Sequence, residues 1–115
     1  MADSNPFDKA HELARSIRQS PAYERYLCAK REIDKHPDYK DKILKVRSRQ
    51  MELNRAHILG EELPADSVAE LSQELSALKQ HEEIAEFFEA ETCYINMFQD
   101  IQNIIQSALD ADLRD

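Results

Sequence analysis

One long amphipathic stretch constrains the fold more than any other part of the sequence. Between Glu83 and Leu109, apolar residues recur every three or four positions, which is the period of one buried face of an α-helix. They are Ile84, Phe87, Phe88, Ile95, Phe98, Ile101, Ile105, Ala108 and Leu109. At about 1.5 Å per residue this helix is roughly 40 Å long, which exceeds the expected width of a globule formed by such a chain. We therefore expect it to contact more than one neighbour.

Proline residues divide the first half of the sequence into three predicted helices. Pro6 and Pro21 each follow a residue that commonly caps a helix, and proline suits the first helical turn. Pro37 ends one helix because the residue before a proline avoids the helical region, and the next helix starts there. The expected helices cover residues 6–19, 21–35 and 37–59.

A fourth helix is predicted between Gly60 and the long C-terminal stretch. Gly60 is placed to end the third helix in a left-handed conformation. The fourth helix starts at Asp66 or Ser67, and Ser67 with Glu70 fits a capping box. It either continues into the last helix or breaks at the polar residues 80–82, and we favour a kink or short break. No strand-like alternation occurs, so the sequence predicts an all-α fold with about five helices, in a single domain over residues 1–115.

The sequence lacks the residue patterns that catalysis and metal binding require. A single glycine cannot build an oxyanion loop or a phosphate cradle, and the four histidines are scattered. Cys28 and Cys93 are far apart in sequence, and we expect them to be reduced and to fill helix packing as small apolar residues. We therefore predict no enzyme activity, no catalytic residue, no metal site and no cofactor. With no signal peptide and no long apolar run, we expect a cytoplasmic protein without a membrane partner.

Charge is distributed unevenly along the chain. Residues 29–60 carry nine Lys/Arg against five Asp/Glu, and residues 61–115 carry two against fourteen. Lys42, Lys45 and Arg49 share one face of the third predicted helix. Either these bases are a solvated face that pairs with nearby acids, or they contact RNA or an acidic protein. No aromatic residue interleaves with them, as nucleic-acid surfaces usually require.

Two sets of residues resemble the YlbF/YmcA family. The first is the segment from Ala10 to Ile17, which reads AHELARSI, followed by Ser20, Tyr23, Tyr26, Ala29, Lys30 and Pro37. The second is Gly60, the leucines at 71, 75 and 78, and then Ile84, Ala90, Glu91, Met97, Ile101 and Ile105. Together they cover residues 7–106. The chain is most similar in character to the uncharacterised YheA-type branch.

The resemblance implies an all-α protein that forms an oligomeric helical array. In Gram-positive bacteria, members of this family act in a cytoplasmic complex that influences competence, sporulation and biofilm formation by steering the ribonuclease RNase Y. The resemblance thus implies a regulatory adaptor, with other regulatory proteins of the family as partners. Better-studied members have clustered cysteines near the C-terminus that are associated with an iron–sulfur cluster. Only Cys93 lies in that half of this chain, which argues against a cluster.

Three functional hypotheses follow from the sequence. The first is a homo-oligomeric adaptor, dimeric or larger, with the long helix at its interface. Its candidate interface residues are Phe87, Phe88, Ile95, Phe98, Ile101 and Ile105. The second is direct RNA binding through Lys42, Lys45 and Arg49. The third is a redox or metal sensor formed by Cys28 and Cys93 across an oligomer.

Overall fold

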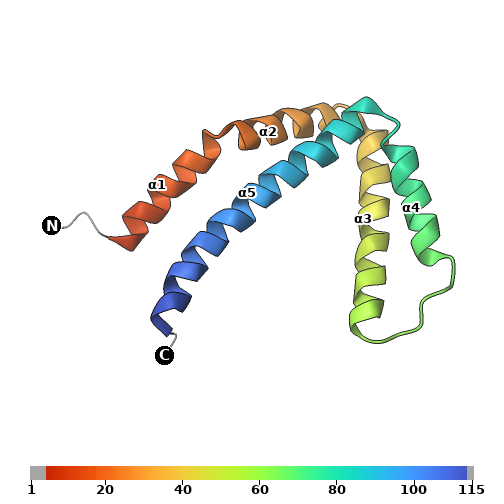
Figure 1. Cartoon of the computed structure of the whole chain (residues 1–115). Helices are drawn as coiled ribbons and strands as arrows, with labels where there is room; N and C mark the ends of the chain where they lie inside the picture. Colours follow the sequence, from red (N-terminus) through yellow and green to blue (C-terminus); the bar gives the residue numbers. More distant parts are fainter. Residues whose placement is uncertain (1–4, 114–115) are drawn as a thin grey trace. The chain divides into compact units, whose positions relative to one another are not determined.

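The computed structural model describes residues 5–113, which form five α-helices and no strand (Figure 1). The helices are α1 (Pro6–Arg18), α2 (Pro21–Asp34), α3 (Pro37–Ile58), α4 (Ser67–Leu78) and α5 (Glu82–Leu113). The predicted all-α class is confirmed, and so is the long C-terminal helix. That helix continues to Leu113 rather than ending at Leu109.

The starts of α1 and α2 are fixed by short polar side chains. The Asn5 side-chain oxygen accepts a hydrogen bond from the Phe7 N–H at 2.8 Å. The Ser20 hydroxyl accepts one from the Tyr23 N–H at 3.3 Å and donates to the Ile17 carbonyl at 2.6 Å. Each cap satisfies an N–H group that has no partner inside its own helix.

Gly60 ends α3 in the left-handed conformation that the sequence predicts. Its φ is +72°, and its N–H donates to the His57 carbonyl at 3.2 Å. The Glu61 N–H donates to the Ala56 carbonyl at 2.9 Å. These two bonds form a Schellman motif, which satisfies carbonyls at the helix end.

The predicted capping box at the start of α4 is wrong. Asp66 is the N-cap residue, and no side chain there makes a capping hydrogen bond. The Glu70 N–H instead donates to the Asp66 backbone carbonyl at 2.8 Å. Ser67 is already the first helical residue, so its hydroxyl is not at the position from which a capping side chain accepts.

The expected break between α4 and α5 is confirmed. At the end of α4, the Lys79 N–H donates to the Leu75 carbonyl at 3.0 Å, and the His81 N–H donates to the Leu78 carbonyl at 3.1 Å. The His81 carbonyl then accepts the first bonds of α5, from the N–H groups at 84 and 85. The polar residues 79–81 thus separate two helices.

The described chain forms two compact units. One contains residues 5–29 and 89–113, and the other contains residues 30–88. α2 and α5 each continue from one unit into the other.

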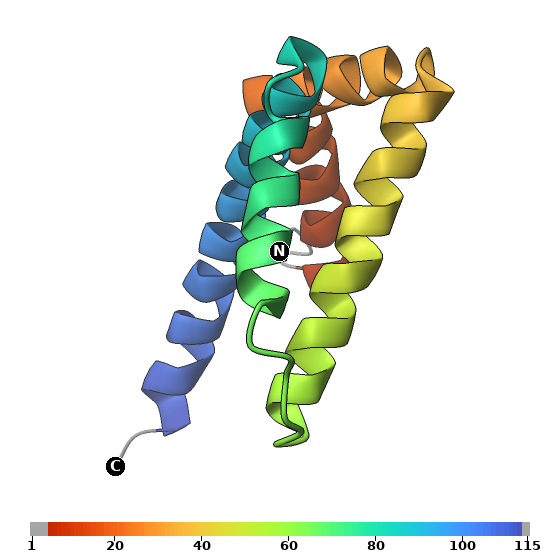
Figure 2. The same ribbon diagram turned by 90° about the vertical axis from the view of Figure 1, so that its right-hand side faces the viewer.

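The unit of residues 30–88 is built on a hairpin of α3 and α4, which pack against each other and are joined by the loop after Gly60 (Figures 1 and 2). Its buried residues come from α2, α3, α4 and the start of α5. They are Ile33, Ile43, Val46, Leu78, Ile84 and Phe87. This small core fixes the position of the α3 face that carries the basic residues.

The unit of residues 5–29 and 89–113 has little buried apolar surface. Ala29 and Ala90 are buried, and α1 has no buried residue. Tyr94 of α5 packs against two tyrosines of α2, with ring centroids 5.5 Å from Tyr23 and 5.2 Å from Tyr26. Much of the apolar surface of this unit therefore faces solvent in a single chain.

Candidate interaction surfaces

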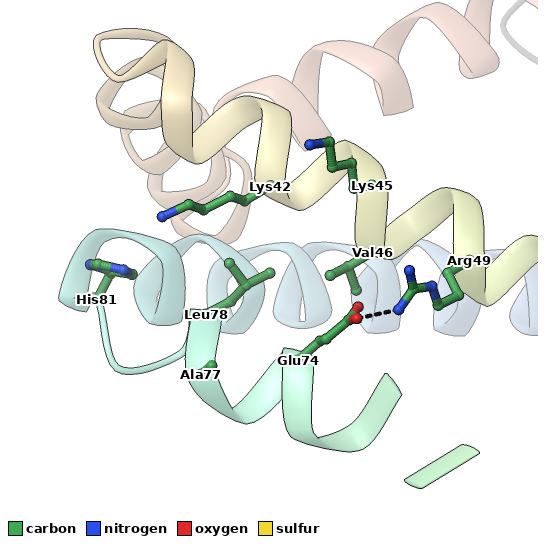
Figure 3. Close-up of a pocket in the computed structure, with 8 residues that line it drawn as sticks. All are labelled: Lys42, Lys45, Val46, Arg49, Glu74, Ala77, Leu78 and His81. Atoms are coloured by element: carbon green, nitrogen blue, oxygen red, sulfur yellow. Dashed lines mark hydrogen bonds and ion pairs between the residues drawn. The ribbon is translucent and has the colours of Figure 1, made fainter. Parts of the chain in front are cut away.

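The structure places the predicted basic residues of α3 along a groove. Lys42, Lys45 and Arg49 lie at steps of three and four residues, so they project from one side of the helix. They line a hollow of about 340 Å³ between α3 and α4 (Figure 3). The complete lining is Lys42, Lys45, Val46, Arg49, Glu74, Ala77, Leu78 and His81, and we refer to it as the α3–α4 groove.

The floor of the α3–α4 groove is apolar. Val46 and Leu78 are buried and point toward each other between the two helices (Figure 3). Ala77 adds a small apolar side chain on the α4 side. An apolar group that enters the groove can thus lose contact with water, which is favourable in proportion to its area.

The charges at the rim are only partly neutralised within the chain. Arg49 of α3 donates a hydrogen bond to the carboxylate of Glu74 on α4. Among residues 5–113, no ion pair involves Lys42 or Lys45. The groove therefore presents two free cations above an apolar floor.

The sequence predicts the α3 side of this groove but not the α4 side. The face of Lys42, Lys45 and Arg49 follows from helical period alone. Glu74 and Leu78 belong to the groove only because α4 packs against α3, and no local pattern gives that pairing. The available signal was the narrow leucine stripe of α4, which marks a packed face but does not identify the neighbouring helix.

Histidine and tyrosine rings contact one another in the same unit, in tilted arrangements. The Tyr39 ring lies between His36 and His81, with ring centroids 4.6 and 4.8 Å away. Tyr39 and both histidines are half-buried, so these two histidines are not free surface residues. His81 lines the groove and is held by this contact.

The six candidate interface residues are divided between the two units. Phe87 is 7% exposed and belongs to the core of residues 30–88, and Phe88 beside it is half-buried. The guanidinium of Arg47 lies over both rings. Phe87 thus has its packing partners inside its own chain.

The other four candidates lie on the C-terminal part of α5, in the unit of residues 5–29 and 89–113. With Leu109 they recur at helical spacing, and we refer to Ile95, Phe98, Ile101, Ile105 and Leu109 as the α5 stripe. Ile95, Phe98, Ile105 and Leu109 are 40–56% exposed, and Ile101 is half-buried. A continuous row of exposed large apolar side chains is uncommon on a monomer and usually marks an interface.

The two cysteines do not fill helix packing, so that prediction is wrong. Both are free thiols on exposed positions of α2 and α5. The guanidinium group of Arg25 donates a hydrogen bond to the Cys93 sulfur at 3.6 Å. Arg25 also pairs with Glu89 at 3.6 Å. Within residues 5–113, no three His, Cys, Asp or Glu side chains gather as metal ligands.

None of the helices in the described part of the chain is both long enough and apolar enough to span a membrane.

Residues 5–113 thus form five helices, with a basic, apolar-floored groove in one unit and an exposed apolar stripe in the other. The chain belongs to the YlbF/YmcA family, which is described as controlling the competence regulator ComK, and the match covers residues 7–110. The resemblance inferred from the sequence is therefore confirmed, and the family is a regulatory one.

Several relatives match over almost their full length. A UPF0342 protein of Symbiobacterium thermophilum is 31% identical over 93% of this chain and 96% of its own. A UPF0342 protein of Caldicellulosiruptor saccharolyticus is 28% identical over 92% of this chain and 88% of its own. One of Alkalihalophilus pseudofirmus is 29% identical, with coverage of 93% and 91%.

Proposed function

We propose that this protein is a non-enzymatic regulatory adaptor, which assembles from two or more copies and brings other proteins together in a cytoplasmic complex that influences RNA processing. The observation that carries the proposal is the α5 stripe, because its large apolar side chains lack cover within one chain. Membership of a family described by control of a competence regulator supports a regulatory role.

The energetics of the α5 stripe favour association of copies. Full burial of an exposed isoleucine, leucine or phenylalanine side chain gains roughly 1.5–3 kcal/mol, so each half-exposed residue of the stripe gains about half of that. Several such residues in one row can offset the lost freedom of two chains, which costs about 4–15 kcal/mol. Acidic residues flank the stripe, so copies must pack with their acids at the rim, where water screens them.

Sedimentation equilibrium at micromolar concentration tests the assembly. We expect a mass of two or more chains, and a single species at the chain mass of 13.4 kDa would overturn the proposal. Affinity purification from the native host, followed by mass spectrometry, then identifies the proteins of the complex. Comparison of RNA ends in the native host with and without the gene for this protein tests the link to RNA processing. Unchanged RNA ends would remove that part of the proposal.

Direct binding of RNA by the basic face of α3 is the second candidate. The observation in its favour is that Lys42 and Lys45 have no ion-pair partner among residues 5–113. Against it, Arg49 is held by Glu74, whose carboxylate would lie beside an incoming phosphate. A gel shift at low salt tests it, with Lys42, Lys45 and Arg49 replaced by glutamate as the negative control. If the wild-type protein gives no shift, direct RNA binding is wrong.

A further inference from the structure

The α3–α4 groove combines two features that seldom occur together on a solvated face. Its floor is formed by the apolar side chains of Val46, Ala77 and Leu78, and its rim carries the free ammonium groups of Lys42 and Lys45. A face that only needed solvation would not require a hollow of about 340 Å³ with an apolar floor. Ligand pockets start at roughly 300 Å³, so one or two apolar side chains can fit.

We propose that the α3–α4 groove binds an acidic amphipathic helix of a partner protein, with an apolar side chain on the Val46–Leu78 floor and carboxylates at Lys42 and Lys45. This inference deepens the adaptor function, because it identifies the chemistry of the partner that one of its surfaces recognises. It does not depend on self-association, which uses the α5 stripe in the other unit.

The spacing of the basic residues matches a helical ligand. Lys42, Lys45 and Arg49 follow one another at three and four residues, and acidic residues at the same steps on an opposing helix share one face. A helix laid along α3 can therefore place carboxylates at the rim while the apolar residues between them face the floor. This is the helix-in-groove mode of peptide recognition.

A neighbouring hollow extends the same face along α3. Leu44, Lys45, Ser48, Arg49 and Glu52 line a second space of about 340 Å³, so Lys45 and Arg49 border both. Leu44 is more than half exposed and offers a further apolar contact. The surface is thus long enough for more than one turn of a bound helix.

The same groove is poorly suited to RNA. Its floor is aliphatic, and the ring of His81 in the lining is already in contact with Tyr39. Glu74 places a negative charge at one end of the lining. Arg49, the residue best suited to bind a phosphate with two hydrogen bonds, already pairs with Glu74. An acidic helix needs only the two free lysines and gains from the apolar floor.

Designed peptides test the proposal on the full chain. The probe is a fluorescently labelled helix of about 18 residues, long enough to be helical, with leucine on one face and glutamate beside it. Its counterpart has lysine in place of every glutamate. We expect the acidic peptide to raise fluorescence anisotropy through a site that requires Lys42 and Lys45. Any binding of the basic peptide should not require these lysines, because acidic residues flank the α5 stripe. Binding should weaken several-fold between about 50 and about 300 mM salt, because the ion pairs are at the rim.

Two variants locate the binding site. The double variant Lys42→Glu, Lys45→Glu should bind the acidic peptide at least about tenfold more weakly, because two exposed charge attractions become repulsions. The matched control, Lys9→Glu with Arg18→Glu, changes net charge equally but lies on α1 and should bind as the wild type does. Ala77→Gln keeps both lysines and adds no charge, and its larger polar side chain on the floor should also weaken binding.

Several results would overturn the proposal. They are acidic-peptide binding that does not depend on Lys42 and Lys45, no binding of that peptide up to about 1 mM protein, or an equal loss in the α1 control. Single-stranded RNA that binds more tightly than the acidic peptide, and is lost with the same two lysines, would assign the groove to RNA instead. The Lys42→Glu, Lys45→Glu variant should sediment as the wild type does. A failure of the groove proposal can therefore be distinguished from a failure of the self-association proposal.

Discussion

The guanidinium carbon of Arg47 lies 5.4 Å from the ring centroid of Phe87, and the same group is 5.8 Å from the ring of Phe88. The contact joins the middle of α3 to the start of α5 within one unit. It assigns one base of the positively charged third helix to packing rather than to an outside partner. The excess of positive charge on α3 therefore overstates how many of its cations are available to bind a partner.

Arg47→Ala should lower the free energy of unfolding by about 1–2 kcal/mol. The variant loses a cation–π contact, worth about 0.5–1 kcal/mol at partly exposed sites, and the packing of the arginine stem over the rings. Urea unfolding followed by circular dichroism measures the change. Lys45→Ala, on the same helix and without an ion pair, is the control and should change stability by less than about 0.5 kcal/mol. Equal effects of the two substitutions would contradict the assigned role of Arg47.

Gly60→Ala should destabilise the protein by about 1 kcal/mol, because an L-residue is strained at a φ of +72°. Apart from Gly60 itself and its two chain neighbours, no heavy atom lies within 4 Å of the position that a Cβ would occupy, so the cost comes from the backbone conformation. Gly60→Asn should therefore recover part of the loss, because asparagine tolerates the left-handed region better. Thermal unfolding of the three proteins should rank Gly, Asn and Ala in that order. A variant with alanine as stable as the wild type would contradict the Schellman assignment.

Glu32 provides a prediction for pH. A hydrogen bond from Lys35 at 2.8 Å, and then the charge of the same ammonium group, lower the pKa of this carboxyl below its ordinary value of 4.5. A carboxyl whose pKa is lower in the folded state adds stability above its ordinary pKa. That stability is lost as the pH falls through the folded pKa.

NMR titration of the Glu32 side chain measures this effect. Lys35→Met should raise the pKa of Glu32 toward its ordinary value, since both main causes of the shift are removed. Lys79→Met removes the same charge at an exposed position elsewhere and should leave the pKa of Glu32 unchanged. If both variants give the same pKa as the wild type, Lys35 is not the cause.

Local patterns predicted most of what depends on neighbours in sequence, with the Ser67–Glu70 capping box as the exception, and they failed where distant helices decide. The helix-ending role of Gly60 and the break near His81 depend on a few adjacent residues. Phe87 and Phe98 fit the same helical stripe, yet one is buried and the other exposed. The difference arises because α3 covers the start of α5, a contact between residues about forty positions apart. The α4 side of the α3–α4 groove, with Glu74 and Leu78, was not predicted for the same reason.

Phe87→Ala should destabilise the unit of residues 30–88 severely. Removing a buried phenylalanine side chain costs about 3–5 kcal/mol, through lost burial and the cavity left behind. A small domain is stable by only about 5–15 kcal/mol, so a large part of the folded population is lost on mild warming. The measurement is the urea midpoint at a fixed protein concentration. An effect below about 1 kcal/mol would show that Phe87 is not a core residue.

Phe98→Asp should separate association from folding. Phe98 is 40% exposed in one chain, so a charge at this position can remain hydrated in a monomer. Buried in the α5 stripe between two copies, the same carboxylate would lose its hydration without an opposite charge, because α5 contains no lysine or arginine. We therefore expect a folded monomer, with the helical circular dichroism of the wild type and a sedimentation mass of one chain. Gln99→Asp introduces the same charge at the next residue, which lies outside the stripe, and should leave the assembly intact. A Phe98→Asp variant that sediments as the wild type does would place the interface elsewhere.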